Sequence, residues 1–254
     1  MNEEKVIEVR HLSSILDGNE ILSDVNLTAN KGEVTVLLGV SGSGKTTLLR
    51  HLLGLYPVEK GEIYLLGQDI TSLTEKQQIA LYLKMGVFYQ NAALLNSMSV
   101  AENIALPLIQ HTNLPDKLIE NIVYKKLGLV NLEEAYHQYP SQLSGGMLKR
   151  AALARAIVMD PPLLFCDEPG AGLDPVSLES LDKLIINLKN LLGMSIFMIS
   201  HEVSSILRIA NRVIYLEKGV VIFQGTIKEA LNSDQPSVTE FFSVPKKDHG
   251  FEKK

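Results

Sequence analysis

The sequence of 254 residues has a single cysteine, Cys166, no tryptophan, and no long apolar run. One cysteine excludes an internal disulfide framework and fits a reducing compartment. The first ten residues carry Glu3, Glu4 and Glu8 without a long apolar stretch, which argues against a signal peptide. No window approaches about 18 apolar residues, so no segment is expected to span a bilayer. Any membrane work would go through a separate subunit.

Positively charged residues are fewer than negatively charged ones. Lys and Arg number 24 against 29 Asp and Glu, which leaves a net charge of −5. Proteins that hold nucleic acids through phosphate contacts carry basic surfaces, so the sequence predicts no nucleic-acid partner. Apolar residues make up 46% and charged residues 21%, as in an ordinary globular domain, and the length allows one substantial core.

Short apolar segments alternate with helical segments along most of the chain. This alternation predicts an α/β fold with a largely parallel sheet covered by helices on both faces. From about residue 91 to 159, apolar residues recur at three- and four-residue spacing, which indicates an inserted helical subdomain. We therefore expect one domain over residues 1–242, with a core of 1–90 and 160–242, the helical subdomain at 91–159, and a flexible tail at 243–254.

The expected strands are short, apolar or β-branched, and bounded by turn residues. They are residues 6–9, 24–28, 34–38, 61–66, 86–89, 163–166 and 195–200, followed by a hairpin of 212–217 and 220–224. The expected helices are residues 45–53, 100–109, 116–127, 147–159 and 176–192, with Pro107, Pro115 and Pro140 as interruptions. Several of these strands lead directly into polar residues, which is where ligands bind in open α/β sheets.

Residues 39–46, Gly-Val-Ser-Gly-Ser-Gly-Lys-Thr, match the phosphate-loop pattern between an apolar strand and a helix. The glycines allow backbone N–H groups to approach phosphates, and the helix N-terminus adds positive partial charge. A flexible glycine turn is the alternative, and the strand-loop-helix context disfavours it. Lys45 would hold the β- and γ-phosphates, and Thr46 would bind Mg²⁺. The nucleotide-binding residues expected here are Gly39, Val40, Ser41, Gly42, Ser43, Gly44, Lys45, Thr46 and the adjoining Thr47.

Two acids, Asp167 and Glu168, follow the apolar strand expected at 163–166. Asp167 would hold Mg²⁺ through a water. Because successive strand side chains point to opposite faces, Glu168 need not share that role and could polarise the attacking water. The alternative, two solvated charges at a strand end, is less attractive beside a phosphate loop. Cys166 faces the other way and is expected to be a small core residue.

Two further residues complete a hydrolytic set. His201 follows the strand expected at 195–200 and would lie beside Glu168, where it could contact the γ-phosphate and orient the water. Gln90 follows the strand expected at 86–89 and could contact Mg²⁺ and the water. A structural histidine and a surface amide are the respective alternatives. The expected catalytic residues are thus Glu168, His201, Gln90 and Lys45, and the expected metal ligands are Thr46, Gln90 and Asp167.

Residues 143–147, Leu-Ser-Gly-Gly-Met, are the most informative segment. Ser144, Gly145 and Gly146 come immediately before the helix expected at 147–159, so their N–H groups and the helix dipole form a second anion-binding end. One chain therefore carries two such ends but only one phosphate-loop lysine. A helix cap with spare glycines is the alternative explanation.

These motifs, in this order, resemble those of the ATP-binding cassette (ABC) ATPases over about residues 8–225. The resemblance implies a P-loop NTPase core with an antiparallel N-terminal β region and an inserted helical subdomain. It also implies an ATPase that works with Mg²⁺ and forms a homodimer through two ATP sites. In such dimers the Ser144–Gly146 segment of one copy closes over ATP held by the other, and Asp174 lies at that interface.

Such ATPases usually stack the adenine on an aromatic residue near the end of the first strand. Counting back from the phosphate loop, the equivalent residue here is Leu16 or Ile15, and no Tyr, Phe or Trp occurs between Met1 and His51. An aliphatic side chain binds the base less tightly than a stacked aromatic ring does. We therefore expect Leu16 to contact the base and discrimination between ATP and GTP to be modest.

The signature ending in Met147, the segment from Gln90 to Asn103, and His-Thr-Asn-Leu-Pro at 111–115 together resemble one branch of this family. That branch serves the maintenance-of-lipid-asymmetry and mammalian-cell-entry (MCE) lipid transporters. The resemblance implies integral membrane permease subunits and an MCE-type lipid-binding protein as partners. It implies a peripheral location at the cytoplasmic face of the inner membrane and phospholipid or another hydrophobic molecule as cargo.

Two other functions remain open from the sequence. An importer ATPase for a polar solute such as an amino acid would share every catalytic motif. A soluble, non-transport ABC protein is disfavoured, because such proteins usually carry two cassettes or long coiled-coil insertions. In a transporter, a short permease helix would dock in a groove around residues 90–108, where Leu94, Leu95, Met98 and Val100 either line the groove or pack the core of the insert.

Overall fold

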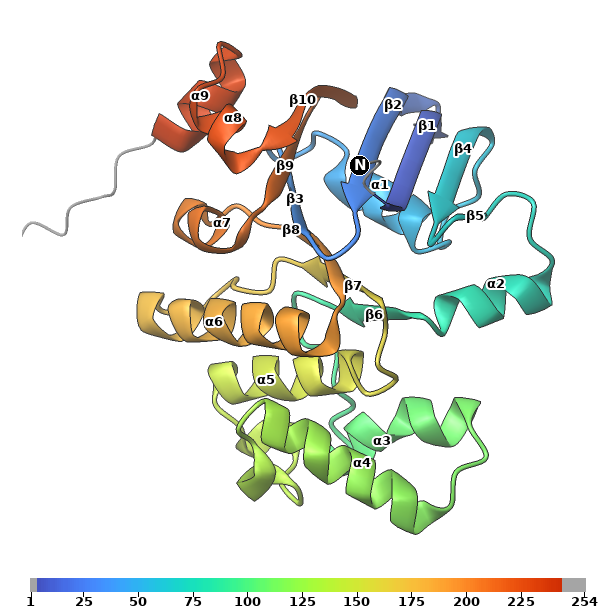
Figure 1. Cartoon of the computed structure of the whole chain (residues 1–254), viewed down its shortest axis with the longest axis vertical. Helices are drawn as coiled ribbons and strands as arrows, with labels where there is room; N and C mark the ends of the chain where they lie inside the picture. Colours follow the sequence, from blue (N-terminus) through green and yellow to red (C-terminus); the bar gives the residue numbers. More distant parts are fainter. Residues whose placement is uncertain (1–3, 244–254) are drawn as a thin grey trace, which may run out of the picture.

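The computed structural model describes residues 4–243 and contains two β-sheets with helices packed around them (Figure 1). One sheet has four strands in the order β2-β1-β4-β5, and the other has six in the order β10-β9-β3-β8-β7-β6. Strands and helices alternate along most of the chain after β3. The predicted α/β fold class, with its antiparallel N-terminal region, is confirmed.

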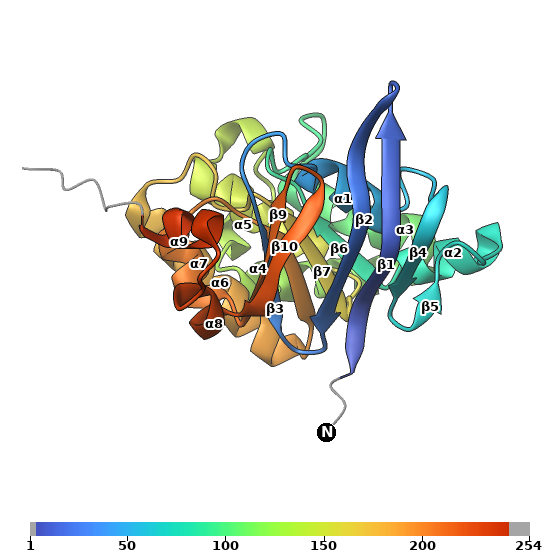
Figure 2. The same ribbon diagram turned by 90° about the horizontal axis from the view of Figure 1, so that it is seen from above.

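The four-stranded sheet is formed mainly by two long strands. Its members are β1 (Lys5–Leu16), β2 (Asn19–Asn30), β4 (Lys60–Leu65) and β5 (Gln68–Asp69). β1 pairs antiparallel with both β2 and β4, and Figure 2 shows these strands beside β10 and β9 of the second sheet. β1 and β2 extend well beyond the predicted 6–9 and 24–28, because backbone pairing continues through their polar ends without needing apolar side chains.

The six-stranded sheet forms the centre of the molecule. Its strands are β10 (Val220–Thr226), β9 (Arg212–Glu217), β3 (Val34–Leu38), β8 (Ser195–Ile199), β7 (Leu163–Asp167) and β6 (Met85–Phe88). β10 is antiparallel to β9, and every other neighbouring pair is parallel. The carboxyl ends of β3, β6, β7 and β8 therefore meet at one edge, where ligands bind in open α/β sheets.

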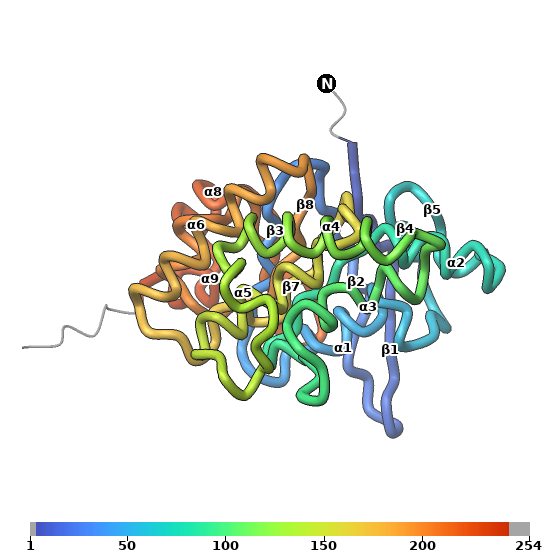
Figure 3. The backbone as a smooth tube through the Cα atoms, turned by 90° about the horizontal axis from the view of Figure 1, so that it is seen from below, coloured from blue at the N-terminus to red at the C-terminus, as the bar shows by residue number. Residues whose placement is uncertain are grey.

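The helices are α1 (Lys45–Leu52), α2 (Glu75–Tyr82), α3 (Val100–His111), α4 (Asp116–Leu129), α5 (Gly145–Ala156), α6 (Pro175–Leu192), α7 (Val203–Ile209), α8 (Ile227–Leu231) and α9 (Pro236–Ser243). α3, α4 and α5 pack on one another at the end of the molecule opposite to α8 and α9, and Figure 3 shows them together from below. Among residues 4–243, no helix combines the length and apolar character needed to cross a membrane.

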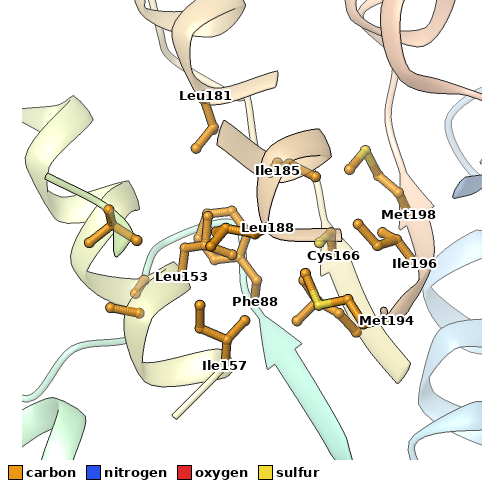
Figure 4. Close-up of a cluster of buried hydrophobic side chains, with 14 of the residues drawn as sticks. Phe88, Leu153, Ile157, Cys166, Leu181, Ile185, Leu188, Met194, Ile196 and Met198 are labelled. Carbon is orange, nitrogen blue, oxygen red and sulfur yellow. The ribbon is translucent and has the colours of Figure 1, made fainter. Parts of the chain in front are cut away.

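One apolar cluster joins the helical insert to the central sheet (Figure 4). Phe88 at the end of β6 is fully buried and lies among side chains of α5 and α6, including Leu153 and Leu188. Cys166 of β7 is also fully buried in this cluster, as predicted, and burial raises the pKa of its thiol far above the ordinary value. The position of α5 is therefore tied by packing to the end of β6.

Several sequence-based boundaries are corrected. α5 begins at Gly145 rather than at residue 147, so the two signature glycines lie inside the helix. α3 contains Pro107, as the predicted range of 100–109 implied, and ends at His111 rather than at residue 109. The helices α2, α7, α8 and α9 were not predicted. α9 places Ser243 in a helix, and the remaining residues of the predicted tail, 244–254, lie outside the described residues.

Candidate nucleotide-binding site

The phosphate loop connects β3 to α1 at the carboxyl edge of the central sheet. Gly39, Gly42 and Gly44 have φ values of 147°, 78° and 103°, in the region that side chains disfavour. A Cβ at Gly39 would lie 2.1 Å from the carbonyl O of Leu216, whereas a Cβ at Gly42 would meet no atom within 4 Å. The loop is thus closely packed at its base and open at Gly42, where a ligand could approach the backbone.

The N-terminus of α1 fits an anion. No side chain of the described residues caps it, and no acid lies in its first turn, so its N–H groups are available to a phosphate. The Nζ of Lys45 donates to the carbonyl O atoms of Gly39 (2.7 Å) and Val40 (2.9 Å). Burial lowers the pKa of this ammonium, and the Glu168 carboxylate opposes that effect. Lys45 is therefore held by its own loop at the mouth of the site.

A cavity of about 700 Å³ brings most of the predicted site residues together. They come from the phosphate loop, from the end of β6, and from the ends of β7 and β8. Ile21 of β2 and Ile199 of β8 supply apolar lining. The predicted residues that line the cavity are Ser41, Gly42, Gly44, Lys45, Thr46, Thr47, Gln90, Asp167, Glu168 and His201.

Glu168 lies just beyond the end of β7, and its backbone adopts a left-handed conformation with φ of 47°. Its N–H donates to the carbonyl O of Ile199 at 3.0 Å. Asp167 and Glu168 both line the cavity, as expected for the two acids at this strand end. The chain leaves strand geometry at Glu168, so the alternation of strand side chains does not describe how its carboxylate reaches the cavity. Strained backbone at such a position is characteristic of functional sites.

His201 lies beside Glu168, as predicted, with its Nε2 at 3.1 Å from Oε1 of the carboxylate. Burial raises the pKa of Glu168, and His201 is the main group that opposes this rise. The carboxylate is about one-sixth exposed, whereas the imidazole is nearly half exposed to solvent. The arrangement can hold a water at Glu168 while His201 faces an incoming ligand.

The structure also brings together the residues proposed to hold a divalent cation. Thr46, Gln90 and Asp167 all line the cavity. Burial raises the pKa of Asp167, and Arg50 and Lys149 oppose this rise. One carboxylate, one hydroxyl and one amide are oxygen donors of the kind Mg²⁺ uses when it also binds substrate phosphates. Residues 4–243 contain no cluster of three or more acids, histidines or cysteines suited to a metal ion.

A separate cavity of about 390 Å³ contains the signature residues Ser144, Gly145 and Gly146 together with Asp174. The Oγ of Ser144 caps α5 by accepting from the N–H of Met147 at 3.3 Å. Asp174 caps α6 by accepting from the N–H groups of Val176 and Ser177, each at 3.0 Å. A Cβ at either signature glycine would meet no atom within 4 Å, so this backbone is open to approach. This cavity and the phosphate cavity share no lining residue.

Leu16 is not brought to the phosphate cavity. It lies with Ile15 at the end of β1, beside a small pocket that also contains His51 and Tyr56. Ile21, at the start of β2, lines the phosphate cavity instead, together with Ile199. No local pattern singles out Ile21, because its position depends on the register of the β1–β2 hairpin.

A groove of about 420 Å³ lies on the helical insert, between α3 and α4. It starts at Ser99, so only the last part of the predicted 90–108 region contributes. Val100 is fully buried in the core, whereas Leu95 is exposed outside the groove. The apolar floor of the groove is formed by Ala105, Ile119 and Val123. Its acidic rim is formed by Glu102, Asp116 and Glu120.

Sequence reasoning missed two cations that contact the Gln90 turn. The Nζ of Lys149 donates to the carbonyl O of Gln90, and Arg155 donates to the carbonyls of Ala92 and Ala93. Both cations belong to α5. The only sequence signal is the presence of basic residues in an alanine-rich helix, and that pattern is also common on solvated helix faces.

Comparisons with known proteins agree with this geometry. Residues 22–171 match the family described as ABC transporter. The chain is 40% identical over 241 residues to the intermembrane phospholipid transport system ATP-binding protein MlaF of Haemophilus influenzae, covering 95% of this chain and 91% of MlaF. It is 38% identical to the probable ribonucleotide transport ATP-binding protein mkl of Mycobacterium leprae, covering 93% of this chain and 68% of mkl.

Solved structures show the same fold. The cbiO1 protein of Clostridium perfringens, part of the ABC transporter complex cbiONQ, superposes with a TM-score of 0.84 at 29% identity, covering 91% of this chain and 92% of cbiO1. The ATP-binding cassette MJ0796, a dimer in a post-hydrolysis state with bound ADP and Pi, superposes with a TM-score of 0.78 at 26% identity, covering 87% of this chain and 98% of MJ0796.

Proposed function

The chain belongs to the ABC transporter family as an ATP-hydrolysing subunit, and from this premise we propose that it drives a permease that moves phospholipid or another hydrophobic molecule between envelope membranes. The observation that carries the cargo class is the 40% identity to an intermembrane phospholipid transport ATPase over 95% of the chain. Met147 at the end of the signature supports the same branch. A polar solute is the second candidate, supported by the similarity to mkl, a probable ribonucleotide transport ATP-binding protein.

In this proposal the phosphate loop binds the phosphates of ATP. The first-turn N–H groups of α1 and the Lys45 ammonium contact the β- and γ-phosphates. Thr46, Gln90 and Asp167 would hold Mg²⁺, which would neutralise charge on the phosphates. Leu16 is proposed as a base contact only from its place in the sequence, whereas Ile21 already lines the cavity.

Glu168 and His201 carry the hydrolytic step. Glu168 accepts a hydrogen bond from the attacking water and polarises it toward the γ-phosphate. His201 holds the Glu168 carboxylate from one side and contacts the γ-phosphate from the other. Gln90 lies at the same cavity and orients the water. Each of these residues acts from the end of a different segment of the central sheet.

Family members form dimers and pair with membrane permeases, and MJ0796 is a dimer with bound ADP and Pi. We propose that the cavity at Ser144 of one subunit closes over ATP bound to the phosphate loop of the other, with Asp174 at the interface. ATP then holds the two subunits together, and loss of the γ-phosphate releases them. This explains why the two cavities of one chain share no residue.

The groove between α3 and α4 is the proposed permease contact. Its apolar floor suits a short amphipathic helix, and its acidic rim favours a helix that carries positive charge. In this proposal the ATPase sits peripherally at the cytoplasmic face of the inner membrane, held there through the permease. An MCE-type lipid-binding protein would complete the complex, as the similarity to MlaF suggests.

Affinity purification of the tagged chain from the membranes of its own cells tests the proposal. The complex is purified from membranes and its bound lipids are extracted, and its ATPase rate is measured with and without phospholipid. We expect co-purified phospholipid and a rate that responds to it. Stimulation by a periplasmic solute-binding protein carrying a polar solute would instead support the importer. A chain that never copurifies with membranes would exclude both transport functions.

A further inference from the structure

The turn after β6 has an unusual backbone. Ala92 and Ala93 are consecutive non-glycine residues with φ values of 59° and 53°. This left-handed region is unfavourable for residues with a Cβ, so the surroundings must stabilise the turn. The turn begins at Gln90, which lines the phosphate cavity. Whatever holds the turn therefore also sets the position of Gln90.

Two cations of α5 hold this turn through its carbonyl groups. The Nζ of Lys149 donates to the carbonyl O of Gln90. Arg155 donates through Nη1 to the carbonyl O of Ala93 at 2.7 Å and through Nη2 to that of Ala92 at 3.0 Å. Three carbonyl groups of one short turn thus accept hydrogen bonds from a single helix. Charge-assisted hydrogen bonds of this kind are stronger than neutral ones.

Burial of the charged Lys149 side chain at this position costs free energy. It is only 7% exposed, and within residues 4–243 no carboxylate lies within 4.0 Å of its ammonium. The ammonium lies 5.7 Å from the centroid of the Phe88 ring. The carboxylates of Asp167 and Glu168 attract it from further away and oppose the lowering of its pKa by burial. Burial of a cation costs free energy when its direct polar partner is a carbonyl rather than a carboxylate. The burial of Lys149 is therefore best explained by the position that it gives to the turn at Gln90.

We propose that Lys149 and Arg155 are positioning residues that clamp the 90–93 turn to α5, so that Gln90 moves with the signature helix of its own chain. The same helix begins at Ser144, which belongs to the second cavity. Packing supports the link, because Phe88 lies against Leu153 of α5 (Figure 4). The inference rests on the proposed role of Gln90 at the phosphate site.

The clamp has a consequence for communication between the two ATP sites of a dimer. A nucleotide that draws the N-terminus of α5 toward the partner also shifts the carbonyl contacts of Lys149 and Arg155. Gln90 then moves at the subunit's own phosphate cavity. One rigid helix is therefore sufficient to report occupation of one site to the other.

Amide hydrogen exchange tests the clamp without relying on catalysis. The N–H of Ala92 donates to the carbonyl O of Tyr89 at 3.0 Å, so its exchange reports opening of the turn. Lys149→Met should speed this exchange about tenfold, and Lys149→Arg should largely restore protection. Lys126→Met is the matched control, because Lys126 is also a buried lysine of the insert but pairs with Asp160. Unchanged exchange in a folded Lys149→Met protein would overturn the clamp.

Should Lys149→Met fail to fold, Arg155→Gln serves instead, since Arg155 is less buried and contacts the same turn. The same rise in exchange at Ala92 is expected. If the Ala92 amide of Arg155→Gln exchanges as slowly as in the unmodified protein, Arg155 does not belong to the clamp. That result would overturn the proposal as stated.

A double-mutant cycle tests whether the clamp acts through Gln90. Lys149→Met should lower the kcat of the ATPase roughly tenfold and change KM for ATP less than about twofold, because the phosphate loop still binds the nucleotide. In a Gln90→Ala background, Lys149→Met should cause no further loss. If the two substitutions lower kcat independently, so that their effects multiply in the double variant, the positioning role is overturned. A fully active Gln90→Ala variant would overturn the proposed role of Gln90, and the clamp would then be decided by the exchange measurement.

Discussion

The imidazole Nε2 of His201 lies 3.1 Å from Oε1 of Glu168, although the two residues follow different strands. β7 and β8 are parallel neighbours with Asp167 opposite Ile199, so the residues just beyond both strands meet at one edge. The left-handed backbone at Glu168 turns its carboxylate into the cavity and toward the imidazole. The pair is thus a product of sheet register together with one unusual backbone conformation.

Replacement of the carboxylate by an amide should stop turnover while leaving ATP binding intact. Glu168→Gln is expected to slow ATP hydrolysis by roughly 10²–10⁴-fold, because the amide is a poor base toward the attacking water. The variant should also accumulate as an ATP-bound dimer, which size-exclusion chromatography with ATP can detect. Glu202→Gln, at an exposed neighbour of His201, is the control. Unchanged turnover in Glu168→Gln would remove Glu168 from the hydrolytic step.

A bulky charge at the signature should block assembly but not nucleotide binding. Ser144→Arg fills the cavity that we propose to close over the partner's ATP and removes the cap on Met147. We expect ATP affinity of the monomer to stay within about twofold and the ATP-dependent dimer to disappear by light scattering. Ser141→Arg, at an exposed position of the preceding turn, should dimerise normally. A Ser144→Arg protein that still dimerises with ATP would contradict the composite site.

Charge reversal in the insert groove should separate ATPase activity from permease binding. Glu120→Lys turns one acid of the groove rim into a base and should reduce copurification of the permease at least several-fold, because like charges would then face one another. The ATPase rate of the isolated chain should be unchanged. Asp234→Lys, between α8 and α9 at the other end of the molecule, is the control. Full copurification with Glu120→Lys would place the docking surface elsewhere.

His51 should make the folded protein less stable in mild acid. It is 3% exposed, its Nε2 lies 2.8 Å from the Oγ of Ser14, and its Nδ1 has no partner in the described residues. Burial lowers its pKa below the ordinary 6.5, while backbone groups of Tyr56 and Pro57 and the Glu59 charge oppose this. The unfolded chain therefore takes up the proton first, and stability falls as pH drops below about 6.5.

Thermal unfolding from pH 8 to pH 5 measures this effect. The decrease in Tm on acidification should be smaller in His51→Gln than in the unmodified protein, even if His51→Gln has a lower Tm throughout. His11→Gln is the control, because His11 is an exposed histidine on β1. Parallel Tm profiles for the unmodified protein and His51→Gln would show that His51 does not bind its proton more weakly in the folded state.

Nucleotide selectivity should be weak. The phosphate cavity has Ile21 and Ile199 as apolar lining and no aromatic residue among the described ones that line it. Because aliphatic contact supplies little base-specific stacking, kcat/KM for ATP and GTP should differ by less than about tenfold. Steady-state assays with each nucleotide measure the ratio. A preference for ATP well above tenfold would indicate a base contact that the cavity lining does not reveal.

The parts of the site that are local in the chain were predictable from the sequence. The phosphate loop is a strand, a glycine loop and a helix in one continuous segment, so its spacing alone identifies it. Asp167 likewise ends a strand whose four preceding residues are apolar and buried. The adjacency of His201 and Glu168 followed from neighbouring strand ends, and the structure confirms it. The individual roles of these residues remain predictions.

Features that depend on distant contacts were not predictable. Lys149 contacts Gln90 across 59 positions of the chain, and nothing in the local pattern of α5 distinguishes it from a solvated lysine. α2 buries only Leu81, so it has no apolar periodicity to detect. The orientation of Glu168 depends on a backbone conformation that leaves strand geometry, which an alternation rule cannot anticipate.

The burial of Cys166 makes the natural chain well suited to site-directed labelling. Its thiol is the only one in the chain, is fully buried, and has a pKa raised far above the ordinary value, so it should resist maleimide reagents. A cysteine introduced at an exposed position outside the phosphate cavity, such as Ser141, can then carry a single fluorophore or spin label without prior removal of the native residue. Replacing Cys166 by serine would be counterproductive, because it would bury a hydroxyl one residue before Asp167. Distances between subunits could thus be followed during turnover in an otherwise unaltered protein.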